Sequence, residues 1–127
     1  MEYDDKNLVN AELEVLKLAP ADVRDAFIGA MTMKKAGIVG SPVTKLNLFK
    51  KGHLLLEGAI KKNPENAEFR FLRLMIQEHA PGFLKYRNNI TEDSELVKNS
   101  YPSQPEEVRQ AMIDYSKKSK VLKLGVS

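Results

Sequence analysis

The amino-acid sequence predicts an all-α fold of about six helices. Apolar residues recur at spacings of three and four positions along several segments, which is the period of one helix face. No segment alternates β-branched or aromatic residues with polar ones, as half-buried strands do. Proline and glycine separate the helical segments, and the short connections predict antiparallel hairpins, either stacked in a row or closed into an irregular bundle. Residues 1–127 have the size of a single domain.

The expected helices follow from these stripes and from the residues that interrupt them. The first covers about Asn7 to Leu18, and the second begins at Pro20, because proline suits the first turn of a helix. The other four cover about residues 42–63, 66–80, 91–101 and, after the cap at Ser103, 104–119. The segment 66–80 is apolar around most of its circumference, which indicates a helix enclosed by others.

Polar residues ahead of three segments predict how these helices begin. Ser41 precedes Pro42 as an N-cap, and Thr91 can cap the fifth helix, with acidic residues in its first turns. Ser103 and Glu106 have the spacing of a capping box, in which the two side chains satisfy free backbone N–H groups reciprocally. The starts of the third, fifth and sixth helices are therefore expected at these caps.

Two glycines lie inside the third expected helix. Gly52 and Gly58 each cost about 1 kcal/mol relative to alanine in a helix interior. A close contact with another helix, which a side chain would block, is the expected compensation at both positions.

Composition excludes several classes of protein. The chain has no cysteine, which removes disulfides, thiolate metal sites and thiol nucleophiles. The N-terminus is acidic rather than basic and apolar, so it does not resemble a secretory signal. No apolar run approaches the length of about 20 residues that a membrane helix needs. We therefore expect a cytoplasmic protein with no membrane partner and no cofactor.

The third helix and the turn after it resemble part of a tetratricopeptide repeat (TPR). That family has small, large and small residues at set spacings in its second helix, followed by a proline in the turn. These positions correspond here to Gly52, Leu56, Ala59 and Pro64. Gly40 falls where the family has a glycine in its first helix, and Pro42 and Val43 depart from the family pattern. The resemblance covers one partial repeat and implies helical-hairpin packing and a groove that binds a peptide. The stretch 63–93 is also similar to short uncharacterised bacterial proteins.

One polar strip interrupts the apolar surface of the segment 66–80. Its members are Asn66, Arg70, Arg73 and Gln77. If this helix is enclosed, uncompensated arginine charges there are expensive, so an anion should face them. One alternative is an internal carboxylate, namely Glu57, Glu92 or Asp93. The other is a groove for a carboxylate, a phosphate or an acidic peptide, because arginine forks suit such groups.

Neither histidine belongs to a recognisable catalytic or metal-binding motif. His53 falls on the polar face of the third helix, and His79 near the end of the fourth. A zinc site needs three or four converging ligands, and no H-x-x-x-H pairing occurs. An enzyme that uses either histidine is thus the least supported of three functions, and we expect no catalytic or metal-binding residues.

The leading functional hypothesis is a non-catalytic module that binds a protein or an acidic peptide. It would act through the strip that contains Arg70 and Arg73, or through an exposed apolar face. The second hypothesis is weak nucleic-acid binding, since the net charge is +3 and lysines gather near the C-terminus. These are Lys117, Lys118, Lys120 and Lys123. The amount of apolar helix surface further predicts that a second copy of the chain could be a partner.

Overall fold

The computed structural model describes residues 21–80 and 85–124, and the regular secondary structure in this part of the chain is helical, with no strand. The α-helices are α2 (Ala21–Ala36), α3 (Pro42–Lys62), α4 (Ala67–His79), α5 (Ile90–Ser100) and α6 (Glu106–Ser116), with a short 3₁₀ helix, η2 (Tyr101–Ser103), between the last two. The all-α prediction is confirmed for this part of the chain. The helix expected at 7–18 lies outside the described residues.

The chain forms two compact units, which are described separately. The first extends from Met1 to Asn63 and the second from Pro64 to Ser127. The expectation of a single domain over residues 1–127 stays a prediction. None of the helices in the described ranges combines the length and the apolar character that crossing a bilayer requires.

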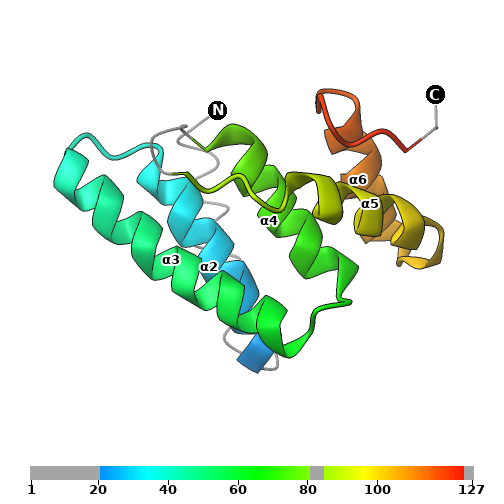
Figure 1. Ribbon diagram of the computed structural model, residues 1–127, viewed down its shortest axis with the longest axis horizontal. Coiled ribbons are helices and arrows are strands. Elements are labelled where there is room, and N and C mark those ends of the chain that lie inside the picture. Colours follow the sequence, from blue (N-terminus) through cyan, green and yellow to red (C-terminus); the bar gives the residue numbers. More distant parts are fainter. Residues whose placement is uncertain (1–20, 81–84, 125–127) are drawn as a thin grey trace. The chain divides into compact units, whose positions relative to one another are not determined.

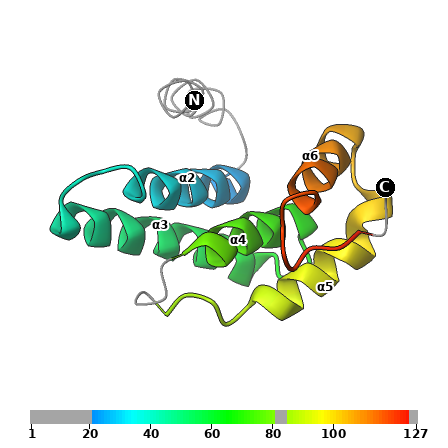
Figure 2. The same cartoon turned by 90° about the horizontal axis from the view of Figure 1, so that it is seen from above.

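In the first unit, α2 and α3 lie side by side along their length (Figures 1 and 2). The buried residues of α2 are mostly small, namely Ala26, Gly29, Ala30, Met33 and Ala36. Ser41 caps α3 as predicted, because its side chain accepts a hydrogen bond from the backbone N–H of Thr44, and Pro42 occupies the first turn. At the other end of the pair, the amide of Asn63 donates to Asp22 at 3.2 Å.

The small residues bring the backbones of α2 and α3 into direct contact. A Cβ atom added at Gly52 would lie 2.4 Å from the carbonyl oxygen of Gly29, and one added at Gly29 would lie 2.7 Å from that of Gly52. The close contact predicted at Gly52 is therefore confirmed. The same prediction is wrong for Gly58 within the described residues, because a Cβ atom there would meet none of their heavy atoms within 4 Å.

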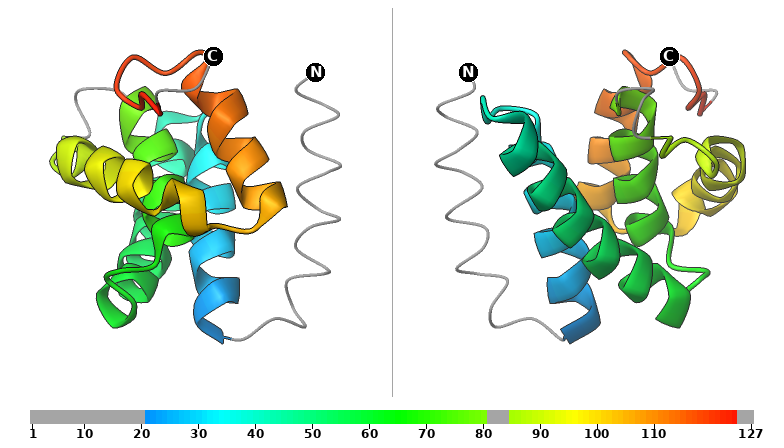
Figure 3. Two further views of the ribbon diagram at one scale, coloured as in Figure 1. Left: turned by 90° about the vertical axis from the view of Figure 1, so that its right-hand side faces the viewer. Right: turned by 60° about the vertical axis from the view of Figure 1, so that its left-hand side comes forward.

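In the second unit, α4, α5 and α6 surround one apolar core (Figure 3). The buried residues of this core are Ala67, Phe71, Leu74, Val97, Met112, Tyr115 and Leu122. Phe71 of α4 meets Tyr115 of α6 edge to face, with ring centroids 5.8 Å apart. Leu122 shows that the chain after α6 also contributes to this core, since its side chain is fully buried.

Two predicted helix starts are wrong. Helix α5 begins at Ile90, with Asn89 and not Thr91 at the N-cap, because the backbone oxygen of Asn89 already accepts from the N–H of Asp93. Helix α6 begins at Glu106, with Pro105 in the N-cap position. The capping box therefore cannot form, because its serine must itself be the N-cap residue.

The residues of the TPR resemblance fall in different places. Gly52, Leu56 and Ala59 are all buried on one face of α3. Gly40, which the resemblance assigns to a first helix, lies in the connection between α2 and α3, since Ser41 and Pro42 start a helix immediately after it. The repeat resemblance itself stays a prediction.

Candidate functional site

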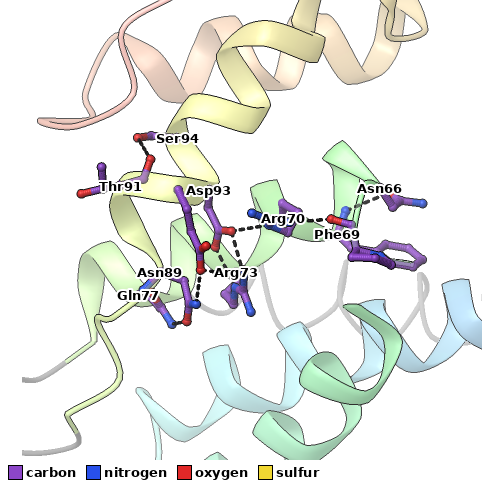
Figure 4. A network of polar contacts seen from close by, with 11 residues as sticks. Asn66, Phe69, Arg70, Arg73, Gln77, Asn89, Thr91, Asp93 and Ser94 are labelled. Atoms are coloured by element: carbon purple, nitrogen blue, oxygen red, sulfur yellow. Dashed lines mark hydrogen bonds and ion pairs between the residues drawn. The ribbon is translucent and has the colours of Figure 1, made fainter. Parts of the chain in front are cut away.

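The four side chains of the predicted polar strip lie along α4, with Asp93 of α5 facing the two arginines (Figure 4). Asn66 stands just before α4, and Arg70, Arg73 and Gln77 follow at intervals of three or four residues. This spacing puts them on one face of the helix. The strip thus forms a polar seam between two helices of the second unit.

Asp93 is the carboxylate that forms ion pairs with both Arg70 and Arg73. Arg73 donates from Nε to Oδ2 of Asp93 at 2.7 Å and from Nη2 to Oδ1 at 2.8 Å. Arg70 donates from Nε to Oδ1 of the same carboxylate. The Asp93 side chain is 0% exposed, and that of Arg73 is 6% exposed. This is the two-pronged arginine–carboxylate geometry that gives strong charge-assisted hydrogen bonds.

A second carboxylate balances the remaining positive charge. Glu92 Oε1 lies 3.8 Å from Arg73 Nη2, and the Glu92 side chain is 57% exposed. A hydrogen bond from the Asn89 side chain lowers the pKa of Glu92, and the positive charges of Arg70 and Arg73 act in the same direction. Two arginines and two carboxylates make this cluster formally neutral, so no further anion is needed to satisfy its charge.

The two amide side chains of the strip are also engaged within the chain. Asn66 caps α4, because its Oδ1 accepts from the backbone N–H of Phe69 at 3.0 Å. Gln77 is fully buried, and it donates to Oδ1 of Asn89 while accepting from the Asn89 backbone N–H, each at 2.9 Å. The residue that precedes α5 is thereby held against the last turn of α4.

All four predicted site residues therefore have partners within the chain. Of the internal carboxylates considered, Asp93 makes the direct contacts with both arginines and Glu92 lies nearby. The arrangement positions α5 on α4 (Figure 4). The interpretation of the strip as a ligand-binding groove stays a prediction, and no contact described here requires a ligand.

A second polar cluster was missed at the end of α4. Glu78 Oε1 accepts hydrogen bonds from the hydroxyls of Tyr115 at 2.7 Å and Ser119 at 2.6 Å, and Oε2 accepts from the backbone N–H of Lys120 at 2.8 Å. The Ser119 hydroxyl also accepts from the backbone N–H of Leu122 at 2.9 Å. Glu78 thus fastens the turn after α6 to α4.

This cluster changes the protonation of two of its members. Burial opposes ionisation of Glu78, but hydrogen bonds from Ser119, Tyr115 and Lys120 outweigh it and lower the pKa of the carboxyl. Burial, followed by the hydrogen bond to Glu78 and its charge, raises the pKa of the Tyr115 hydroxyl well above its ordinary value. Ser119 therefore faces a carboxylate that is a weaker base than usual, which does not favour activation of its hydroxyl.

The residues of the other two functional hypotheses fall as follows. His53 stacks on Phe49, and His79 Nε2 lies 3.0 Å from the Tyr115 hydroxyl. Within residues 21–80 and 85–124, no three acidic or histidine side chains gather to hold a metal ion. Of the C-terminal lysines, Lys117 lies 4.0 Å from Asp114, and Lys123 donates to the backbone oxygen of Ser119 at 3.0 Å.

The exposed apolar surface is concentrated on α3 and the loop before it. Among the described residues, the large apolar side chains that are exposed are Ile38, Val43, Leu46, Leu54 and Val121. Four of these five belong to residues 38–54, and Leu54 is the most exposed at 73%. Isolated apolar residues are common on protein surfaces, but a group on one helix face is typical of an interaction site.

The sequence contains a signal for this surface in the angular positions of the apolar residues around α3. Successive helix residues are separated by about 100°, so Leu54 points about 200° away from the buried Gly52. Val43 and Leu46 also fall off the buried face, whereas Leu56 lies on it. We call the outer side of α3 that carries Val43, Leu46 and Leu54 the α3 face.

No family model, curated protein or solved structure matches the chain.

Proposed function

We propose that this chain is a non-catalytic protein-interaction module that binds its partner through the α3 face. The observation that carries the proposal is the concentration of exposed Val43, Leu46 and Leu54 on one helix whose opposite side packs on α2. Burying such side chains against a partner contributes roughly 25 cal/mol for each Å² of apolar surface. Helix faces of this kind are recognised by grooves or by other helices.

Helix α3 is rich in basic residues, and this charge indicates which kind of partner its exposed apolar residues could bind. Helix α3 contains five lysines and a single acidic residue, Glu57. Complementary charge promotes encounter and discourages wrong partners. The proposal therefore favours an acidic protein or peptide, as the polar strip was first expected to bind, but at a different surface. The TPR resemblance supports it only by analogy of helical-hairpin packing.

Site-specific photo-crosslinking in the source cell tests the proposal. A photoreactive amino acid replaces Lys50, which is exposed on the α3 face beside Leu54, and a control places it at Asn99, exposed on α5. We expect a discrete adduct from position 50 and not from position 99. The adduct should disappear when Val43→Glu and Leu46→Glu are combined. An adduct that survives this double substitution would remove the α3 face as the binding surface.

A further inference from the structure

No contact among the described residues explains why position 58 is a glycine. It is exposed in the interior of α3, where glycine costs about 1 kcal/mol relative to alanine. Gly29 and Gly52 offset such a cost through the backbone contact between α2 and α3, but a Cβ atom at Gly58 would meet open space. A glycine on a helix surface allows another backbone to approach closely.

Gly58 lies on the α3 face beside its most exposed residue. Leu54 and Gly58 are four residues apart, which places them one above the other on the helix surface. The other neighbours of Leu54 at this spacing are Lys50, Lys51 and Glu57. The surface therefore combines a protruding leucine, an adjoining notch and positive charge.

We infer, building on the proposed function, that the partner presents an acidic amphipathic helix that packs across α3 at Gly58 and covers Leu54. The notch favours a helix, because at the other glycine of α3, Gly52, it is the backbone of a helix, α2, that approaches closely. The lysines indicate acidic residues beside the partner's apolar stripe. A second copy of α3 in this place would bring lysines together.

An anionic lipid surface fits these observations less well. Helices that lie in a membrane interface insert large apolar side chains, including aromatic ones, on one side. The α3 face exposes valine and leucine, whereas Phe49 is half-buried. A lipid surface adapts to the shape of the helix, so it gains nothing from a glycine at position 58.

The test selects helical peptides against the full chain. Two libraries of displayed peptides are used, each about 18 residues long and each with a randomised apolar stripe along one face of the helix. In one library the residues beside this stripe are acidic, and in the other they are basic. We expect binders from the acidic library alone. Affinity of the selected peptide, measured by fluorescence anisotropy, should fall at least about tenfold with Leu54→Glu and with Gly58→Leu. Asn99→Leu adds the same side chain to an exposed position of α5 and should leave affinity unchanged.

The variants separate failure of this inference from failure of the proposed function. Loss of binding with Leu54→Glu but not with Gly58→Leu would keep the α3 face and overturn the close helix contact. Binding that survives Leu54→Glu would overturn both. Binders from the basic library, or from neither library, would overturn the acidic-helix chemistry. Two further results would overturn the acidic-helix partner. One is binding to vesicles of phosphatidylcholine and phosphatidylglycerol that is equally strong for the Gly58→Leu chain and the unsubstituted chain. The other is a dimer of the chain that Leu54→Glu dissociates.

Discussion

The two compact units hold their helices together by different physical means. In the first, the backbones of α2 and α3 meet at Gly29 and Gly52, and the surrounding side chains are mostly small and apolar. In the second, α5 is positioned on α4 by a buried carboxylate between two arginines. The contact between α2 and α3 requires that Gly29 and Gly52 have no side chain, whereas the contact between α4 and α5 requires the charged groups of Asp93 and the arginines. The two units should therefore tolerate different substitutions.

The units also differ in what they leave exposed. The apolar residues of α4 are almost all covered, and its polar strip is engaged by α5. One side of helix α3 packs on α2, and Val43, Leu46 and Leu54 are exposed on its other side. The second unit thus buries most of the apolar residues of α4 together with its charged Arg73. The first unit leaves aliphatic residues of α3 exposed, and these form the surface proposed to bind a partner.

The largest expected effect is at Asp93. Asp93→Ala leaves Arg73 buried without its carboxylate, which should lower the free energy of unfolding by about 3–5 kcal/mol. Chemical denaturation followed by circular dichroism measures this loss. Asp114→Ala, which removes an exposed ion pair with Lys117, is the control and should change stability by less than about 1 kcal/mol.

Hydrogen exchange in the same variant tests whether the two units are separable. We expect Asp93→Ala to increase exchange in α4 and α5 while α2 and α3 keep their protection. Equal loss of protection in all four helices would contradict the division of the chain into two units.

Gly52→Ala comes next. The added methyl group would lie 2.4 Å from the oxygen of Gly29 and 2.9 Å from the nitrogen of Met33, both backbone atoms, so the helices must separate. A loss of about 1–3 kcal/mol is expected from such overpacking. Thermal unfolding of the variant checks this value. An unchanged melting temperature would show that α2 and α3 are not in backbone contact in solution.

Glu78→Gln should have a smaller, pH-dependent effect. The folded pKa of Glu78 is lowered, so its contribution to stability is fully present above the ordinary value of 4.5 and is lost as pH falls through the folded pKa. The glutamine variant should be less stable by about 1 kcal/mol at neutral pH, since its hydrogen bonds are no longer charge-assisted. Urea midpoints of the two proteins should converge below pH 4.5. A difference that persists in acid would assign the effect to packing.

The smallest effect is expected at Gly58, and it has the opposite sign. The methyl group of Gly58→Ala meets no neighbour in the part of the chain that the structure describes, and it removes the helix cost of glycine, so stability should rise by about 0.5–1 kcal/mol. Thermal unfolding of this variant beside Gly52→Ala gives a matched pair in one helix. A destabilised Gly58→Ala chain would reveal an internal contact at this position and remove the basis for a partner helix there.

The sequence alone determined the helical class and the helix positions that depend on local chemistry. The cap at Ser41 and the proline at position 42 act on the nearest backbone groups, so their effect can be predicted from neighbouring residues. The need of Arg70 and Arg73 for an anion also followed from the sequence, because charge on an enclosed helix requires a partner.

Only the tertiary structure decided which partners these groups meet. Asp93 lies 20 residues after Arg73, and Ser119 lies 41 residues after Glu78, so no local rule joins them. Thr91 does not cap α5, because Asn89, which Gln77 of α4 holds by two hydrogen bonds, occupies the N-cap position. Ser103 does not cap α6, because Pro105 occupies its N-cap position. Gly52 and Gly58 are both glycines of α3. They differ because α2 lies against Gly52, whereas a Cβ atom at Gly58 would meet no atom of residues 21–80 and 85–124 within 4 Å.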